Sequence, residues 1–378
     1  MKGVFEIAQR DANTNARRGR LHLRRGVLNT PAFMPVGTKG AVKTLDPNDA
    51  RECGAEILLG NAYHLWLRPG HETVAKAGGL NAFMAWDKPI LTDSGGYQVM
   101  SLAAKRKLSE EGAEFRSEID GSLRMLTPEL SIEIQQALNS DVMMCFDECS
   151  PHPAPYAQLK LAMERSLRWA MRSKDAARPN GQLLFGIIQG GMNTALRIES
   201  AEKMRQIGFP GYAVGGLGVG EEKPIMYEMV AFAAELLPEE KPRYLMGVGT
   251  PEDILHAVRN GIDMFDCVLP TRNARHAFLN STQGPVRIRN AQYKEDMSPI
   301  DERCRCAACR RFSRAYLRHL YVEKEPLAAR LMTIHNLHFY LHMMRGARRA
   351  IENGVFDEMS ARPGDLFLLG QEEAAPTG

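Results

Sequence analysis

The chain has 378 residues, of which 44% are hydrophobic and 25% charged, an ordinary globular composition with enough length for a large core. No apolar run reaches the roughly 18 residues that a membrane helix needs, and the N-terminus lacks the apolar core of a signal peptide. We therefore expect a cytoplasmic protein without a membrane partner. The formal net charge of +3 is too small to identify a nucleic-acid partner by itself.

Eight short apolar runs recur along the chain, and none alternates as a half-exposed strand would. They are rich in Val, Ile, Leu and Phe, which is the pattern of strands buried on both faces. The runs are PAFMPV (31–36), EILLG (56–60), PILTD (89–93), DVMMCFD (141–147), LLFGIIQG (183–190), GYAVGG (211–216), RYLMGV (243–248) and GIDMFDCV (261–268).

Helical stretches lie between most of these runs, and two carry clear start signals. In LTPELSIEIQQALNS, Thr127 is a candidate N-cap and Pro128 takes the first helical position. In GTPEDILHAVRNG, Thr250 and Pro251 repeat this arrangement, with Asp253 at capping-box spacing. Buried strands that alternate with helices predict an α/β fold, a (β/α)8 TIM-like barrel. A doubly wound sheet is the main alternative, but no GxGxxG follows a first strand.

Basic residues gather in three clusters, and such clusters can hold phosphate groups. Solvated surface faces are the plainer interpretation of the same pattern. The clusters are Arg17, Arg18, Arg20, Arg24 and Arg25, then Arg272, Arg275, Arg287 and Arg289, then Arg310, Arg311, Arg314 and Arg318.

The seven cysteines do not form a disulfide framework, because their count is odd and three of them fall within six residues. Cys304, Cys306 and Cys309 form a CxCxxC motif, whose thiolates can wrap a tetrahedral Zn²⁺ ion if a fourth ligand is added. His335 and His338 follow about thirty residues later. We favour His335, although spacing alone does not decide, and we expect His342 to lie on a helix surface. A closed site of this kind is structural rather than catalytic.

The cysteine motif lies where the alternation of strands and helices breaks. We predict a barrel core over residues 1–284 and an inserted or appended zinc-binding subdomain over 285–345. A C-terminal helix over 346–370 is predicted to pack on the barrel, and residues 371–378 to form a frayed tail.

Three aspartates, Asp93, Asp147 and Asp266, directly follow apolar runs. In a (β/α)8 barrel, the functional groups lie at the carboxyl ends of the strands. A partly desolvated carboxylate there costs free energy unless it is paired or used. One such aspartate is more often a turn former or a helix cap, whereas three on separate strands indicate an active site.

Glycines and an amide follow the same strand ends, in SGGY (94–97), QGG (189–191) and GGLG (215–218). Glycine lets the backbone approach a ligand closely, and the Gln189 amide is both donor and acceptor. With two aspartates, these groups suit the edge of a purine. Tyr97 is a candidate for stacking on a base or for core packing. No GxxxxGK[ST] motif indicates a nucleoside triphosphate.

Seven motifs that follow one another in a fixed order along the chain point to one protein family. The motifs are LTDSGGYQ, FDEC, IIQGG, YAVGGLGVGE, YLMGVGTPEDI, MFDCVLPTRNAR and CxCxxC with a distant His. Together they resemble the tRNA-guanine transglycosylase family, of the bacterial type, across nearly the whole chain. The resemblance implies a TIM-like barrel with a zinc subdomain, a homodimer, and a tRNA substrate with a G-U-N anticodon. It also implies exchange of the wobble guanine for 7-aminomethyl-7-deazaguanine, a 7-deazaguanine base on the route to queuosine.

The resemblance also implies roles for individual residues. Asp266 would be the nucleophile and Asp93 the general acid and base, while Arg272 and Arg275 would contact the anticodon. His335 would complete one structural Zn²⁺ site per subunit with Cys304, Cys306 and Cys309. The substrate-binding residues would be Ser94, Gly95, Tyr97, Asp147, Cys149, Gln189, Gly215, Gly216, Leu217, Val219 and Met246.

The sequence differs from the family at two places, and two other functions are possible alternatives. Gly218 stands where many bacterial members carry Ala or Ser, and the loop 271–284, TRNARHAFLNSTQG, differs from many relatives. A non-catalytic, zinc-stabilised RNA-binding partner subunit is one alternative, but it would be expected to lack Asp93 or Asp266. A barrel hydrolase of small glycosides is the other, and the zinc motif and arginine clusters disfavour it.

Overall fold

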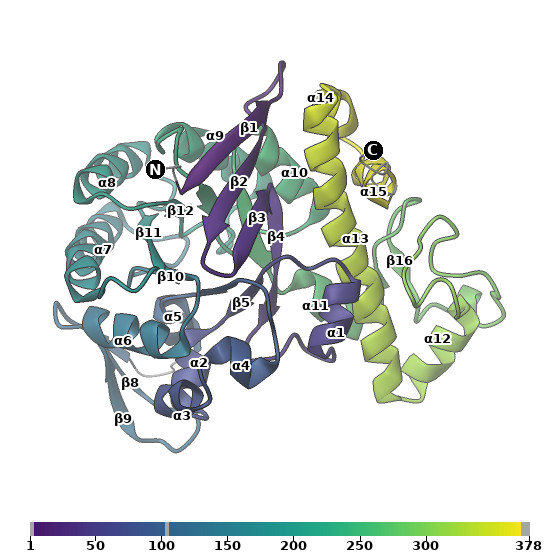
Figure 1. The fold of residues 1–378 in the computed structure, drawn as a ribbon, viewed down its shortest axis with the longest axis horizontal. Coiled ribbons are helices and arrows are strands. Elements are labelled where there is room, and N and C mark those ends of the chain that lie inside the picture. Colours follow the sequence, from purple (N-terminus) through teal and green to yellow (C-terminus); the bar gives the residue numbers. More distant parts are fainter. Residues whose placement is uncertain (1–3, 103–105, 372–378) are drawn as a thin grey trace.

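The eight apolar runs form one closed parallel barrel in the computed structural model, which describes residues 4–102 and 106–371 (Figure 1). Pairing of the last strand with the first closes the barrel, so the doubly wound alternative is wrong and the predicted barrel is confirmed. The strands in barrel order are β4 (Ala32–Gly37), β5 (Leu58–Gly60), β6 (Ile90–Thr92), β10 (Val142–Met144), β11 (Leu183–Ile188), β12 (Tyr212–Val214), β13 (Arg243–Leu245) and β14 (Met264–Cys267).

Helices surround the barrel and follow most of its strands. Both predicted start signals are confirmed, since Thr127 caps α6 through its side chain and Thr250 forms a capping box with Asp253 at the start of α10. The helices are α1 (Pro47–Glu52), α2 (Ala62–Leu67), α3 (His71–Lys76), α4 (Leu80–Met84), α5 (Gly96–Leu102), α6 (Pro128–Leu138), α7 (Tyr156–Ala176), α8 (Thr194–Ile207), α9 (Lys223–Glu235), α10 (Pro251–Arg259) and α11 (Leu269–Arg275).

Three small antiparallel sheets add to the barrel. The first, β1 (Phe5–Arg10), β2 (Arg17–Leu23) and β3 (Gly26–Thr30), precedes the first barrel strand. The second, β7 (Arg106–Leu108), β8 (Ala113–Arg116) and β9 (Leu123–Leu126), is inserted between β6 and α6. The third pairs β15 (Phe278–Leu279) with β16 (Val286–Arg287) in the segment that leads to the cysteine motif.

The first basic cluster is partly internal. Arg17 and Asp263 are both buried, and two guanidinium nitrogens of Arg17 donate to the Asp263 carboxylate at 3.0 and 2.6 Å. Arg24 and Arg25, in the β2–β3 turn, donate to the Asn139 carbonyl, and Arg25 also pairs with Asp141 at 3.1 Å. These three arginines therefore stabilise the start of the barrel and are not a phosphate-binding surface.

Breaking the buried pair should be costly. Arg17→Met is expected to lower the free energy of unfolding by about 3–5 kcal/mol, because it leaves the Asp263 carboxylate buried without its cation. Arg20→Met, on the exposed side of the same strand, should change it by less than about 0.5 kcal/mol. Urea unfolding of both variants measures the difference, and equal small losses would contradict the structural role of Arg17.

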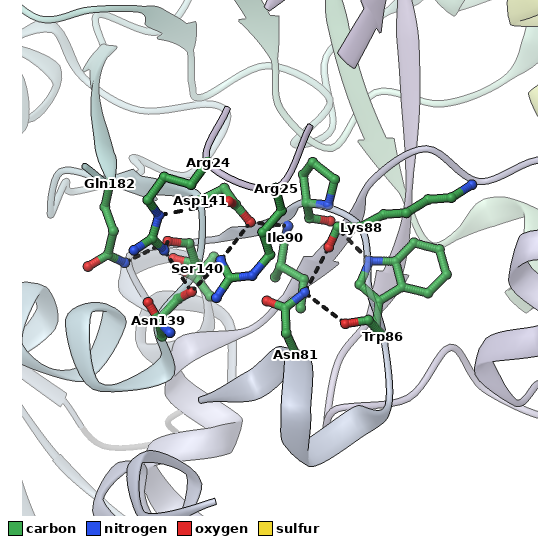
Figure 2. Close-up of polar contacts among 12 residues, drawn as sticks. Arg24, Arg25, Asn81, Trp86, Lys88, Ile90, Asn139, Ser140, Asp141 and Gln182 are labelled. Atoms are coloured by element: carbon green, nitrogen blue, oxygen red, sulfur yellow. Dashed lines mark hydrogen bonds and ion pairs between the residues drawn. The ribbon is translucent and has the colours of Figure 1, made fainter. Parts of the chain in front are cut away.

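The beginnings of β6 and β10 are joined by Asp141 (Figure 2). Its backbone N–H donates to the Ile90 carbonyl at 2.7 Å, and its carboxylate accepts from the Ile90 N–H at 2.9 Å. The two strands thus start in fixed register, and Asp93 and Asp147 follow their far ends.

The C-terminal third holds the cysteine motif, and the long helix α13 (Pro326–Glu352) lies between the barrel and the segment that carries this motif (Figure 1). The remaining elements are the 3-10 turn η1 (Ala291–Tyr293), α12 (Arg314–Val322), α14 (Phe356–Met359) and α15 (Pro363–Gln371). Helix α13 lies against α11, α15 and β4, and it runs through the boundary predicted at residues 345 and 346. Apart from Gln371, the predicted frayed tail lies outside the described residues. None of the described helices has the length and apolar character needed to cross a membrane.

Candidate functional site

A cavity of about 530 Å³ opens at the carboxyl ends of the barrel strands. Asp93, Asp147 and Asp266 all line it, although they come from β6, β10 and β14. The barrel therefore brings together three carboxylates that lie up to 173 residues apart in the sequence. This is the face of a (β/α)8 barrel where active sites are found.

Asp93 directly follows β6, and its side chain is held from the end of β5. Its carboxylate accepts hydrogen bonds from the Asn61 side-chain amide and, at 2.8 Å, from the Ala62 N–H. Burial raises the pKa of Asp93 to about 6, while the bonds from Asn61 and Ala62 oppose the shift and the nearby Asp266 charge adds to it. A carboxyl group of this kind can both accept and release a proton near neutral pH.

Asp266 lies within β14 and faces the same cavity. Its Oδ1 accepts from the Tyr244 hydroxyl at 2.6 Å and from the Gly247 N–H at 2.9 Å. Burial raises the pKa of Asp266, and these two hydrogen bonds oppose the rise. Because both bonds are made to Oδ1, Oδ2 is the oxygen available to a substrate atom.

Asp147 and Gln189 form a buried polar pair on the neighbouring wall. Gln189 Nε2 donates to Asp147 Oδ2 at 2.7 Å, and the Ser94 hydroxyl donates to Asp147 Oδ1 at 3.2 Å. Burial raises the pKa of Asp147 to about 6, and these two bonds oppose it. The pair places a carboxylate and an amide side by side in the cavity wall, and together they offer the acceptor and donor atoms that recognition of a base edge requires.

The glycines beside this pair are needed for close packing. A Cβ atom on Gly216, whose φ is +67°, would lie 2.5 Å from Gln189 Oε1, and one on Gly215 would lie 2.6 Å from Gln189 Nε2. Leu217 and Val219 follow and also line the cavity. Side chains at 215 or 216 would displace Gln189, so the backbone itself forms this part of the wall.

The other predicted site residues divide into two groups. Tyr97, which is 55% exposed, lines the cavity together with Met246, Cys149 and Arg272. Gly95 and Arg275 do not line it. Gly95, with φ +83°, turns the chain between Ser94 and α5, and Arg275 donates to the Thr271 carbonyl at 2.9 Å.

Cys304, Cys306, Cys309 and His335 form a buried group whose ligand atoms all lie within 4.8 Å of one another. The three sulfur atoms are 3.7, 3.6 and 3.3 Å from His335 Nδ1. A tetrahedral Zn²⁺ site with Zn–S of about 2.3 Å and Zn–N of about 2.0 Å needs sulfur–nitrogen separations of roughly 3.5 Å. The group therefore fits a metal ion of this size and ligand preference.

The second ring nitrogen of His335, Nε2, fixes the orientation of the ring through a contact with the backbone. Nε2 lies 2.6 Å from the Asn280 carbonyl, which selects the orientation that presents Nδ1 to the thiols. His338 instead contacts the Gln371 side chain at 3.2 Å. The expectation that His342 lies on a helix surface is wrong. It is 8% exposed, because α15 covers that part of α13.

Several residues that hold the site were missed by sequence reasoning. Asn61 and Tyr244 orient Asp93 and Asp266, and Glu221 accepts from the Gly218 and Val219 N–H groups at 2.5 and 2.9 Å. Asn61 directly follows the predicted strand EILLG, so the rule used for the aspartates could have found it. Tyr244 lies inside an apolar run, where nothing local distinguishes it from a core residue.

Comparison with known proteins gives a consistent match. Residues 11–363 match the family model described as queuine tRNA-ribosyltransferase. A queuine tRNA-ribosyltransferase of Francisella tularensis subsp. novicida (strain U112) is 53% identical over 354 residues, which cover 94% of this chain and 96% of the relative. One of Caldanaerobacter subterraneus subsp. tengcongensis is 54% identical over 348 residues, covering 92% and 93%. The match includes both the barrel and the metal-ligand group.

Proposed function

Because the chain belongs to the queuine tRNA-ribosyltransferase family, we propose that it is a tRNA-guanine transglycosylase. It exchanges the wobble guanine of tRNAs with G-U-N anticodons for 7-aminomethyl-7-deazaguanine, a step toward queuosine. The observation that carries the proposal is the pair of carboxylates, the buried Asp93 and the half-buried Asp266, in one cavity with the Asp147–Gln189 pair. A family member without catalysis would have no need to keep both carboxylates.

The proposed reaction has two displacement steps at the ribose C1′ atom. Asp266 Oδ2 attacks C1′ and the C1′–N9 bond breaks, so guanine leaves with the bonding electrons and takes a proton from Asp93. The result is an ester between Asp266 and the RNA. The incoming base then gives its N9 proton to Asp93 and attacks C1′, which releases Asp266. Two inversions give net retention, as in retaining glycosidases.

The base-binding wall would select the incoming base. Asp147 can accept from the N–H groups of a guanine-like edge, while the Gln189 amide and the backbone of Gly216 and Leu217 supply donors and acceptors. Tyr97 and Met246 would cover the two faces of the base. Ser94, Cys149 and Gly215 line the cavity and complete the proposed base contacts, whereas Gly95 would act only through the turn that it makes after Ser94. Val219 would limit the pocket to a small 7-substituent.

The other proposed partners follow from the family and from the metal-ligand group. Arg272 and Arg275 would hold the anticodon, with the wobble base turned out of its stack at a cost of a few kcal/mol. The Cys304, Cys306, Cys309 and His335 group would bind one structural Zn²⁺ ion per subunit within the subdomain 285–345. We further propose a cytoplasmic homodimer.

Base exchange should depend on pH through the two carboxyl groups with raised pKa. Asp93 and Asp147, with pKa about 6, are ionised at pH 7.5 and largely protonated at pH 5, whereas ordinary aspartates stay ionised at both. The ionised forms take the proton from the incoming base and accept from its N–H groups. We expect kcat/KM for the free base to fall at least about tenfold from pH 7.5 to pH 5. A flat profile over this range would contradict these roles.

The experiment that tests the function is incorporation of labelled guanine into unmodified tRNA with a G-U-N anticodon. The same tRNA with the wobble guanine replaced by adenine is the control. Uptake with the first RNA only is expected. No uptake with either would indicate a non-catalytic partner subunit and would contradict the proposal.

A further inference from the structure

Strands β6 and β10 pair over only two residues, Leu91 with Val142 and Thr92 with Met143. On its other side, β10 continues along β11 as far as Met144, and the Cys145 N–H donates to the Phe185 carbonyl at 3.0 Å. Neighbouring residues of a strand direct their backbone groups to opposite sides. The N–H and C=O of Met144 therefore face β6 where that strand no longer pairs.

The side-chain amide of Gln135, from α6, takes both of these backbone groups. The Met144 N–H donates to Gln135 Oε1 at 2.9 Å, and Gln135 Nε2 donates to the Met144 carbonyl at 2.9 Å. A side-chain amide carries the same donor and acceptor as a peptide group. The Thr92 hydroxyl adds a third bond, to Oε1 at 3.1 Å. Gln135 is fully buried and acts as a bridging amide between the two strand ends.

A second branch of the same network reaches the active site. Gln135 Nε2 also donates to the Ser131 hydroxyl at 3.2 Å, and Ser131 donates to the Ser94 carbonyl at 2.7 Å. Ser94 follows Asp93 and donates its own hydroxyl to Asp147. All four hydrogen-bonding positions of the bridging amide are filled, so its orientation is determined by both strands.

We propose that Gln135 is a positioning residue of the active site, whose bridging amide sets the separation between Asp93 and Asp147. The inference rests on the proposed function. Continuous pairing would keep β6 and β10 about 4.8 Å apart up to their last residues. Instead, Asp141 joins their beginnings (Figure 2) and the Gln135 side chain lies between their ends. Asp93, the proposed acid and base, and Asp147, which would bind the base edge, are thereby held apart with space for the base between them.

The next strand ends are held in the same manner by the outer helices. The Glu148 N–H donates to the Ser166 hydroxyl of α7 at 2.9 Å. The Gln189 N–H donates to the Ser200 hydroxyl of α8 at 3.0 Å. One bond is made next to Asp147 and the other at Gln189. Buried polar side chains of the three consecutive helices α6, α7 and α8 therefore hold the base-binding wall.

The test compares Gln135→Met, which keeps the shape but removes the amide, with Gln136→Met on the same helix. Gln136 is half-buried, donates to the Arg178 carbonyl at 2.9 Å and does not line the cavity. Guanine binding without tRNA is measured by calorimetry, and kcat and KM for guanine by exchange, well below each variant's Tm. We expect Gln135→Met to raise both Kd and KM for guanine at least about tenfold and Gln136→Met to change them less than twofold.

Ser131→Ala is the second variant, because it keeps the bridging amide and removes only the branch to Ser94. A smaller rise, about threefold or more in KM for guanine measured well below the Tm of the variant, is expected. The proposal is overturned if Gln135→Met, or Ser131→Ala where Gln135→Met does not fold, binds guanine as tightly as Gln136→Met. Absence of exchange by the wild type would instead overturn the proposed function.

Discussion

Replacing Asp266 by alanine is expected to abolish base exchange, with a loss of at least about 10⁴-fold in kcat. Removal of a nucleophile commonly has an effect of this size, because no other group can form the covalent intermediate. Asp266→Asn should be equally inactive, because the amide nearly matches the shape of the carboxylate and lacks only its nucleophilic charge. Incorporation of labelled guanine measures the loss.

The proposed covalent step can be tested directly. When wild-type protein is denatured with tRNA in the absence of a second base, we expect an RNA–protein adduct on a denaturing gel, and none with Asp266→Ala. The thermal unfolding temperature of the variant should be unchanged or raised, since a partly desolvated carboxylate is removed. Guanine uptake by Asp266→Ala would leave base exchange intact and would remove Asp266 from the nucleophilic role.

Loss of the proposed Zn²⁺ ion is expected to have the largest effect on stability. Cys306→Ser removes one thiolate of the buried Cys304, Cys306, Cys309 and His335 group, which ties the segment before α12 to α13. Structural Zn²⁺ sites contribute folding free energy directly. We expect the free energy of unfolding to fall by about 4–5 kcal/mol or more, and metal content after gel filtration to fall from one ion per chain to near zero.

Cys53→Ala is the matched control for this prediction. Cys53 is also buried and lies beside the same helix, where its thiol donates to the Ile334 carbonyl at 3.5 Å, but it is not one of the four ligands. We expect this variant to keep one ion per chain. Full metal content in Cys306→Ser would show that this group does not hold the ion and would contradict the proposed site.

The sequence by itself determined the barrel, the starts of two of its helices and the place of its carboxylates. Strands buried on both faces need continuous apolar runs, and a helix start needs a side chain that accepts from its free N–H groups, as Thr127 and Thr250 do. Asp93, Asp147 and Asp266 could be located because polar residues directly after buried strands must lie at one end of the barrel. Each of these features depends on residues that are close together in the sequence, so the sequence alone is enough to predict it.

The tertiary structure decided which side chains hold these groups. The partner of Asp93 is Asn61, that of Asp266 is Tyr244, and that of Asp147 is Gln189, each more than twenty residues away. Arg17 belongs to a basic cluster in the sequence but to a buried ion pair in the fold. His335 and His338 are equivalent by spacing, and the Asn280 carbonyl distinguishes them. A buried polar group must find a partner of fixed geometry, and only the path of the whole chain determines which partner lies within reach.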